Sequence, residues 1–267
     1  MKGFLNNTKQ LSKLGFFTSL LSLSFSVNAA FPVFSQQGQF EWSANVGLSW
    51  LQTGNSNVVI SEFETDRLRQ TRTPLAGDLG LGIAYLIPLN KSARTDLTWF
   101  PELRTALNIR YMDQEIIGQN VYGEADLFQD PNMNNYTYDL SLASTRLMID
   151  LVLTVASMER FSVFLLGGVG AGWTQVDYKD RPNPGIVGGA LSLNSRTNNR
   201  LVGEAGAGLA YDCNNQFRFS LAYLYTDYGT IKTGSQGVID FNNPITINPM
   251  RFSFHTQAIL FGVHIKV

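Results

Sequence analysis

Charged residues recur at alternate positions within extended, mostly apolar runs of this sequence, and they are its best candidates for a shared polar site. Side chains alternate between the two faces of a β-strand, so each run would place its charges on one face and its apolar residues on the other. Charges of mixed sign on a buried face are expected to pair, because an unpaired buried charge is costly. The nine residues of this set are Glu41, Asp78, Glu102, Arg104, Arg110, Arg146, Asp150, Glu204 and Arg218.

Residue types that could support catalysis are scarce. The two histidines are His255 and His264, and His264 lies on the charged face near the end of its run, where a lone histidine is more often structural. Ser253 and His255 follow a Ser-x-His order, but no carboxylate stands at a position that would complete a triad. Cys213 is the only cysteine and has no partner for a disulfide. We therefore predict no enzymatic activity, no cofactor and no metal site.

The N-terminal segment has the composition of a secretory signal peptide. Lys2, Lys9 and Lys13 precede the apolar stretch Leu14–Val27, and small residues follow up to a cleavage position after Ala29. A membrane-anchoring helix is the alternative, but the stretch falls short of the ~20 residues that a span requires. Removal of three lysines from a net charge of −1 leaves −4, which argues against a nucleic-acid partner.

The rest of the chain contains eight extended runs with period-2 alternation. The links between them alternate between long and short, and no run after residue 30 approaches the ~18 apolar residues of a membrane helix. An even number of strands with short turns at one end and long loops at the other is typical of a bacterial outer-membrane barrel. The expected runs are 40–51, 76–87, 97–112, one ending at 155, 161–173, 202–211, 217–226 and 250–267, and the expected long loops are 53–75, 113–136, 178–197 and 230–249.

Aromatic residues bracket the apolar face of these runs at two levels. The bracketed spans of roughly ten residues would rise about 25 Å at ~3.3 Å per residue and ~40° tilt, the height of the apolar band of a membrane barrel. Aromatics sorted into two levels on one face are not needed in a soluble sandwich. We predict a short-turn girdle of Trp42, Tyr85, Trp99, Phe161, Tyr211 and Phe217, and a long-loop girdle of Trp50, Tyr111, Trp173 and Tyr225.

The charged face must point into the lumen, since a basic residue facing lipid at mid-membrane costs roughly 2–4 kcal/mol. An eight-stranded lumen is only wide enough for side chains to fill, so we predict a plug of paired charges, with Glu204 and Arg218 as candidate partners. The alternative is a narrow pore lined by the four arginines. Pro101 predicts a bulge in its strand, and the change of phase above Arg146 predicts either a bulge or the end of the membrane zone.

The long loops would carry the contacts outside the cell. Residues 113–136 include five acidic and no basic residues, so this loop could contact cations or a host receptor, although such loops are more often simply solvated. The sequence does not name a partner.

Two hairpin strands carry a family resemblance. Gly206–Asp212, a short turn and Leu221–Gly229 resemble the penultimate hairpin of opacity-type and OmpA/OmpX-like eight-stranded outer-membrane proteins, and Gly167–Trp173 is similar to their fifth strand. The C-terminal residues Gly262, Ile265 and Val267 resemble the signal read by the barrel-assembly machinery, although the chain ends in Val rather than Phe. The family implies surface antigens, adhesins and small barrels that stabilise the envelope.

We therefore expect a signal peptide at 1–29, a periplasmic tail at 30–39 and an outer-membrane barrel at 40–267. The fold class is all-β, an eight-stranded antiparallel up-and-down transmembrane barrel. Its expected partners are outer-membrane lipid and lipopolysaccharide, the barrel-assembly machinery and a host or surface ligand at the loops, and the barrel would be a monomer. A narrow porin and a soluble exported barrel that binds an apolar ligand are the alternatives.

Overall fold

The computed structural model describes residues 38–54, 56–61, 64–69, 73, 75–90, 97–124, 134–239 and 243–267. The expected signal peptide at 1–29 lies outside these residues, as does the expected tail up to residue 37. In this part of the chain, no helix is both long and apolar enough to cross a membrane.

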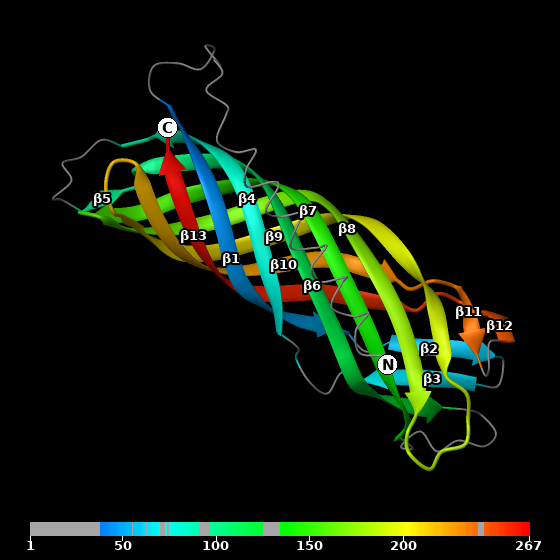
Figure 1. Ribbon diagram of the computed structural model, residues 1–267. Coiled ribbons are helices and arrows are strands. Elements are labelled where there is room, and N and C mark those ends of the chain that lie inside the picture. Colours follow the sequence, from blue (N-terminus) through cyan, green and yellow to red (C-terminus); the bar gives the residue numbers. More distant parts are fainter. Residues whose placement is uncertain are drawn as a thin grey trace, which may run out of the picture. The chain divides into compact units, whose positions relative to one another are not determined.

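Eight long strands close into a β-barrel (Figure 1). Each pairs antiparallel with the next along the chain, and β1 closes the ring by pairing with β13, from Glu41↔Lys266 to Thr53↔Phe254. The predicted all-β, up-and-down architecture is confirmed. The strands of the ring are β1 (Gln39–Thr53), β4 (Leu75–Pro88), β6 (Glu102–Glu124), β7 (Asn134–Met158), β8 (Phe161–Pro182), β9 (Leu191–Asp212), β10 (Phe217–Lys232) and β13 (Arg251–Lys266).

The strands extend well beyond the predicted runs at the long-loop end. Much of the segments expected as loops at 113–136 and 178–197 is strand, because β6 continues to Glu124 and β9 already begins at Leu191. The 25 residues of β7 rise about 60 Å at ~3.3 Å per residue and ~40° tilt, more than twice the ~25 Å apolar band. The loop expectation was wrong here, because these extensions carry polar residues on the outer face.

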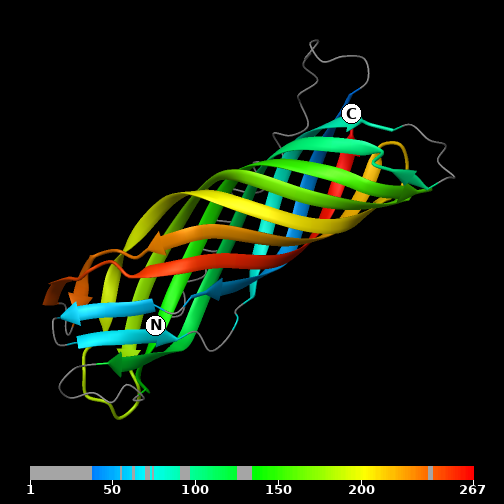
Figure 2. The ribbon, with the colours of Figure 1, turned by 180° about the vertical axis from the view of Figure 1, so that it is seen from behind.

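Two short hairpins complete this extension (Figure 2). β2 (Ser56–Ser61) pairs with β3 (Glu64–Arg69), and β3 also pairs with the upper part of β6. Similarly, β11 (Gln236–Ile239) pairs with β12 (Asn243–Thr246) and with the upper part of β9. The segments expected as loops at 53–75 and 230–249 therefore contribute strands as well.

The two faces of β7 exchange character above Arg146. Below it, Ile149 points outward, whereas above it Tyr138, Leu140 and Leu142 are buried inside. Pairing with β8 runs without a register shift from Tyr136 to Thr154, so the change of phase marks the end of the membrane zone and not a bulge in β7. Phe252 and Phe254 of β13 are buried in the same way.

These inward residues build an upper core inside the extension. Tyr138 and Tyr178 stack there with ring centroids 6.0 Å apart, and the Tyr178 hydroxyl donates to Asp180 Oδ2 at 3.0 Å. Burial raises the pKa of Tyr138 to about 12. Burial and the neighbouring Asp180 carboxylate together hold the pKa of Tyr178 well above its usual range. Both phenols are therefore neutral members of the upper core.

A short strand, β5 (Thr98–Trp99), precedes β6 and pairs with β7. Trp99 faces Ala156, whereas Leu103 faces Leu153, so three residues on one side oppose two on the other. Phe100 has a positive φ of 50° at this point. The bulge predicted from Pro101 is confirmed.

Candidate functional site

The nine charged residues expected in the lumen all lie on the inner face of the barrel, and eight of them are buried. Glu102 is the exception, with its side chain 17% exposed. They form two separate groups at different heights. The lower lumen cluster contains Glu41, Glu102, Arg104 and Arg218, and the upper lumen cluster contains Asp78, Arg110, Arg146, Asp150 and Glu204.

The lower lumen cluster lies near the short-turn end. Arg104 of β6 places Nη1 3.1 Å from Glu41 Oε1 of β1, and its guanidinium lies over the Phe164 ring, 5.5 Å from the centroid. Arg218 of β10 bonds Glu102 through Nη1. Two basic residues thus neutralise two acidic ones across three strands, β1, β6 and β10.

Asp212 extends this cluster to the rim, one residue beyond the Tyr211 girdle and outside the membrane span. Its carboxylate accepts hydrogen bonds from Arg218 Nε at 3.0 Å and from Lys266 Nζ at 2.7 Å. Burial alone would raise the pKa of the Asp212 carboxyl, but these bonds outweigh it and hold the pKa below its ordinary value. Asp212 is therefore ionised and links β9, β10 and β13.

In the upper lumen cluster, the strand register places two arginines opposite each other. Arg110 and Arg146 face each other directly across β6 and β7, where like charges repel. Each arginine turns to acids on other strands. Arg146 Nη2 lies 2.7 Å from Asp78 Oδ2, and Arg110 Nη2 lies 3.3 Å from Glu204 Oε1 and 3.6 Å from Asp150 Oδ2. Two guanidinium groups thus serve three carboxyl groups.

The expected pairing of Glu204 with Arg218 is wrong. Glu204 faces Thr226 in the β9–β10 ladder, whereas Arg218 faces Asp212 eight residues away along β9. Glu204 joins Arg110 instead, and Arg218 joins Glu102 and Asp212. Adjacent strands brought these two side chains onto one face but at different heights.

The upper lumen cluster depends on Gly168, which faces the lumen. A Cβ built on Gly168 would lie 1.9 Å from Asp150 Oδ1 and 3.2 Å from Glu204 Cγ. The absent side chain therefore leaves the space that these two carboxyl groups occupy.

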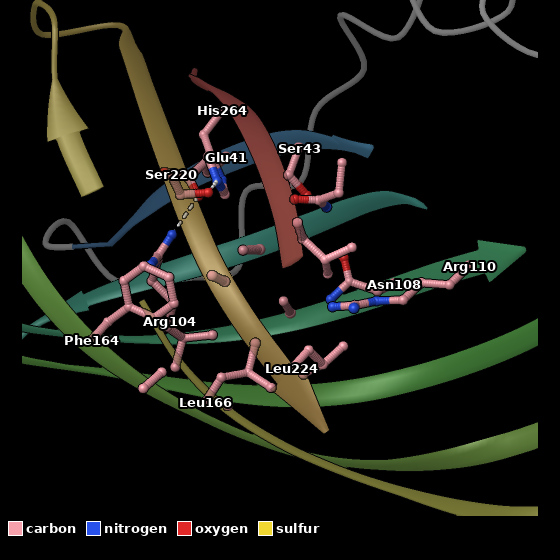
Figure 3. Close-up of a pocket in the computed structure, with 18 of the residues that line it drawn as sticks. Glu41, Ser43, Arg104, Asn108, Arg110, Phe164, Leu166, Ser220, Leu224 and His264 are labelled. Carbon is pink, nitrogen blue, oxygen red and sulfur yellow. Dashed lines mark hydrogen bonds and ion pairs between the residues drawn. The ribbon is translucent and has the colours of Figure 1, made fainter. Parts of the chain in front are cut away.

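An apolar layer separates the two clusters and contains a cavity of about 60 Å³ (Figure 3). Phe164 packs with Val152 and Ala210 on one side of this layer, and Leu224 packs with Leu260 on the other. Arg104 and Arg110 enter the cavity from below and above. From the short-turn end upward, the lumen contains ion pairs, an apolar layer, ion pairs and the upper core.

The lower lumen also holds a hydrogen-bonded group that was not expected from the sequence. Ser220 Oγ lies 2.8 Å from His264 Nε2, and His264 Nδ1 lies 2.9 Å from Glu41 Oε1. His264 was expected on the lumen face, as a lone structural residue. Its neighbours could have been found from the register in which β13 pairs with β1 and β10 to close the barrel. In that register His264 faces Ser43 of β1 and Arg218 of β10.

The other residues considered for catalysis lie elsewhere. His255 Nε2 is 2.7 Å from Gln52 Oε1, and Ser253 lies exposed on the outer face near the top of β13. Cys213 is exposed in the turn after β9. Within the described residues, no group of three or more His, Cys, Asp or Glu side chains could hold a metal ion.

The outer face carries an apolar belt between the two expected aromatic levels. Leu147, Ile149 and Leu151 of β7 are 42–57% exposed in the middle of the belt. At the short-turn level, Phe161 packs against Tyr211, with ring centroids 4.9 Å apart. Trp42, Trp99, Phe161, Phe217, Trp173 and Tyr225 are exposed, and Tyr85, Tyr211, Trp50 and Tyr111 are half-buried.

The residues of the expected assembly signal lie on β13 and at its end. Gly262 points into the lumen and Ile265 outward, and Val267 donates its backbone N–H to Phe40 O at 2.9 Å. Their reading by the assembly machinery stays a prediction.

No protein-family model matches the sequence, and no curated protein matches it. Among solved structures, Neisserial surface protein A is 10% identical (TM-score 0.37; 85% of this chain and 97% of that one covered). The attachment invasion locus protein Ail of Yersinia pestis is 11% identical (TM-score 0.37; 87% and 100% covered). The outer membrane protein OprG of Pseudomonas aeruginosa is 14% identical (TM-score 0.41; 86% and 97% covered).

The identity of the fold rests on the barrel itself. A closed sheet leaves no unpaired edge in hydrocarbon, and an outward apolar belt between aromatic levels around a polar lumen suits a bilayer and not water. The narrower resemblance to opacity-type proteins stays a prediction. The chain is an eight-stranded antiparallel β-barrel of the bacterial outer membrane, as its resemblance to OmpA/OmpX-like proteins predicts.

Proposed function

We propose that this barrel has a structural and surface-interaction role, with a closed lumen below and a rigid binding platform outside the cell. The observation that carries the proposal is that side chains fill the lumen at every level, apart from the cavity of about 60 Å³ in the apolar layer. Two ion-pair clusters, the apolar layer between them and the upper core together occupy the space that a porin would keep open. The narrow-porin alternative would need all four layers to move.

The extension supplies the surface for partners. Among the described residues, its most exposed apolar side chain is Val187, which is fully exposed in the tip loop between β8 and β9. Asn183 anchors this loop by donating its backbone N–H to Asn135 O at 2.8 Å and its side-chain amide to Asn134 O at 2.9 Å. An anchored loop loses little entropy on binding. We propose a host or surface ligand for this end, and outer-membrane lipid and lipopolysaccharide around the belt of a monomeric barrel.

Conductance in planar bilayers tests the closed lumen. The purified protein should give closed traces at moderate voltage. A steady conductance that disappears in Arg104→Ala would instead support a narrow porin. Recovery of the native protein in a detergent-free soluble fraction would favour the soluble exported alternative.

Adhesion of expressing bacteria to host cells tests the platform. Replacement of residues 184–189 by Asn-Gly removes the tip loop and keeps Asn183 in place. We expect adhesion to fall in this variant and to persist when Cys213 is changed to Ser at the opposite end. Equal adhesion of both variants and the parent would contradict a role for the tip loop. Protease cuts confined to the extension on intact cells would support its outward orientation.

A further inference from the structure

The Ser220, His264 and Glu41 side chains form a relay with the connectivity of a serine-hydrolase triad (Figure 3). A carboxylate can only accept a hydrogen bond, so the His264 Nδ1–H donates to Glu41 Oε1. His264 Nε2 is then left with its lone pair toward the Ser220 hydroxyl, which donates to it. This is the tautomer in which an imidazole can take the proton of an attacking hydroxyl.

The cavity of about 60 Å³ gives a reacting group room beside the relay, because Ser220, His264 and Asn45 all line it. Asn45 of β1, Gly262 of β13 and Ser220 of β10 form one row across three paired strands. A Cβ on Gly262 would lie 2.4 Å from Ser220 Oγ, 2.6 Å from Asn45 Oδ1 and 2.9 Å from His264 Nε2. The absent side chain of Gly262 therefore leaves the space in which the Ser220 hydroxyl, the Asn45 amide and the His264 ring converge.

Donors for a developing oxyanion are also present. Arg104 borders the same cavity; its Nη1 bonds Glu41 and its Nε lies 3.8 Å from Glu102 Oε1. The Asn45 amide also borders the cavity, and a half-turn of the amide exchanges Oδ1 for Nδ2. A guanidinium and an amide in the wall of the cavity can stabilise negative charge on a substrate oxygen.

We propose that Ser220 is an activated nucleophile that accepts the acyl group of small esters, with His264 as its base and Glu41 as a positioning residue. Ser220 Oγ bonds to the ester carbonyl carbon while its proton passes to His264. The ester C–O bond then breaks, and the alcohol leaves with that proton. A water molecule hydrolyses the acyl-serine by the same route, releasing the acid and restoring the hydroxyl. This inference goes beyond the proposed structural role.

The size and walls of the cavity define the substrate class. Its volume of about 60 Å³ and its walls of Phe164, Leu166 and Ala222 suit a short acyl group.

Incubation of the folded barrel with p-nitrophenyl acetate tests the proposal. We expect p-nitrophenolate release and one acetyl group on the Ser220 peptide, found by mass spectrometry after an acid quench. Ser220→Ala should lose this acetylation. Ser162→Ala is the matched control, because Ser162 is equally buried and lies two strands away in the same row, across Ala210. Heat-modifiable migration on a gel selects the folded protein in every sample.

The base and the positioning residue have separate readouts. His264→Gln should slow Ser220 acetylation by roughly 10²–10⁴-fold, the usual contribution of a general base. Glu41→Ala should slow it as well, and Glu41→Asp should restore part of the lost rate, which a merely structural carboxylate would not do. Acetylation of Ser220 no faster than that of Ser162 in the unaltered protein overturns the proposal, even if the His264 variant fails to fold. So does an unchanged rate in folded His264→Gln.

Discussion

Removal of the Arg146 guanidinium should be among the most destabilising single changes in the barrel. Arg146 is fully buried, lies 2.7 Å from Asp78 Oδ2, donates to Thr226 Oγ1 at 3.2 Å and sits over the Tyr228 ring. Arg146→Met keeps most of the side-chain volume and removes the charge. Arg110 would then face three carboxyl groups alone. Breaking a buried pair in this way costs about 3–5 kcal/mol.

The Arg181–Asp139 pair provides a control of the same geometry. Its N–O distance is also 2.7 Å, but the Arg181 side chain is 55% exposed. Exposed ion pairs contribute only about 0–1 kcal/mol, so Arg181→Met should change little. The two variants together separate the effect of burial from the effect of distance.

Reversible unfolding in urea with lipid vesicles measures both free energies. A double variant, Arg146→Met with Asp78→Asn, should be less destabilised than Arg146→Met alone, because it no longer buries an unpaired carboxylate. If Arg146→Met lowered the free energy of unfolding no more than Arg181→Met, the ion pairs of the lumen would not stabilise the barrel as argued.

Three further changes test other parts of the structure. Gly168→Ala should cost about 1–3 kcal/mol through overpacking against Asp150 Oδ1, 1.9 Å from the added Cβ, whereas Gly167→Ala, with nothing within 4 Å, should stay within about 0.5 kcal/mol in the same urea assay. Ile149→Arg on the lipid face, where Ile149 is 57% exposed, should cost about 2–4 kcal/mol, and a smaller loss than for Thr145→Arg near the rim would contradict the placement of the belt. The lowered pKa of Asp212 contributes stability that is present above its unfolded pKa of about 3.9 and is lost as the pH falls through its folded pKa. Asp212→Asn should therefore weaken the fall of the urea unfolding midpoint at acid pH. An unchanged dependence of the midpoint on pH would exclude this linkage.

The membrane half of the fold was predictable because lipid enforces one rule on every strand. Charges such as Arg104 and Asp150 had to face inward, and aromatics such as Trp42 and Trp173 had to face outward, so period-2 alternation was enough. Outside the bilayer that rule reverses. Leu140 and Val176 became core, and their polar neighbours looked like loop residues.

Pairings in the lumen were not predictable for a different reason. The alternation of side chains along a strand gives the face on which a residue lies. It does not give the height of the residue in the barrel, which depends on the register of every pair of strands around the ring. Glu204 and Arg218 share a face on adjacent strands and still lie far apart along them. The contact of His264 with Ser220 and Glu41 likewise depends on how β13 closes against β1 and β10.

The exchange of faces above Arg146 also determines how deeply the barrel sits in the membrane. If the barrel rose, the Ile149 level would leave hydrocarbon for water at a cost of about 25 cal/mol per Å² of apolar surface. If it sank, Asp139 and Asp177 on the outer face would enter hydrocarbon. Either displacement is opposed along β7 and β8. The extension is therefore held at a constant height above the lipid headgroups, and the tip loop reaches a partner at a defined distance from the cell surface.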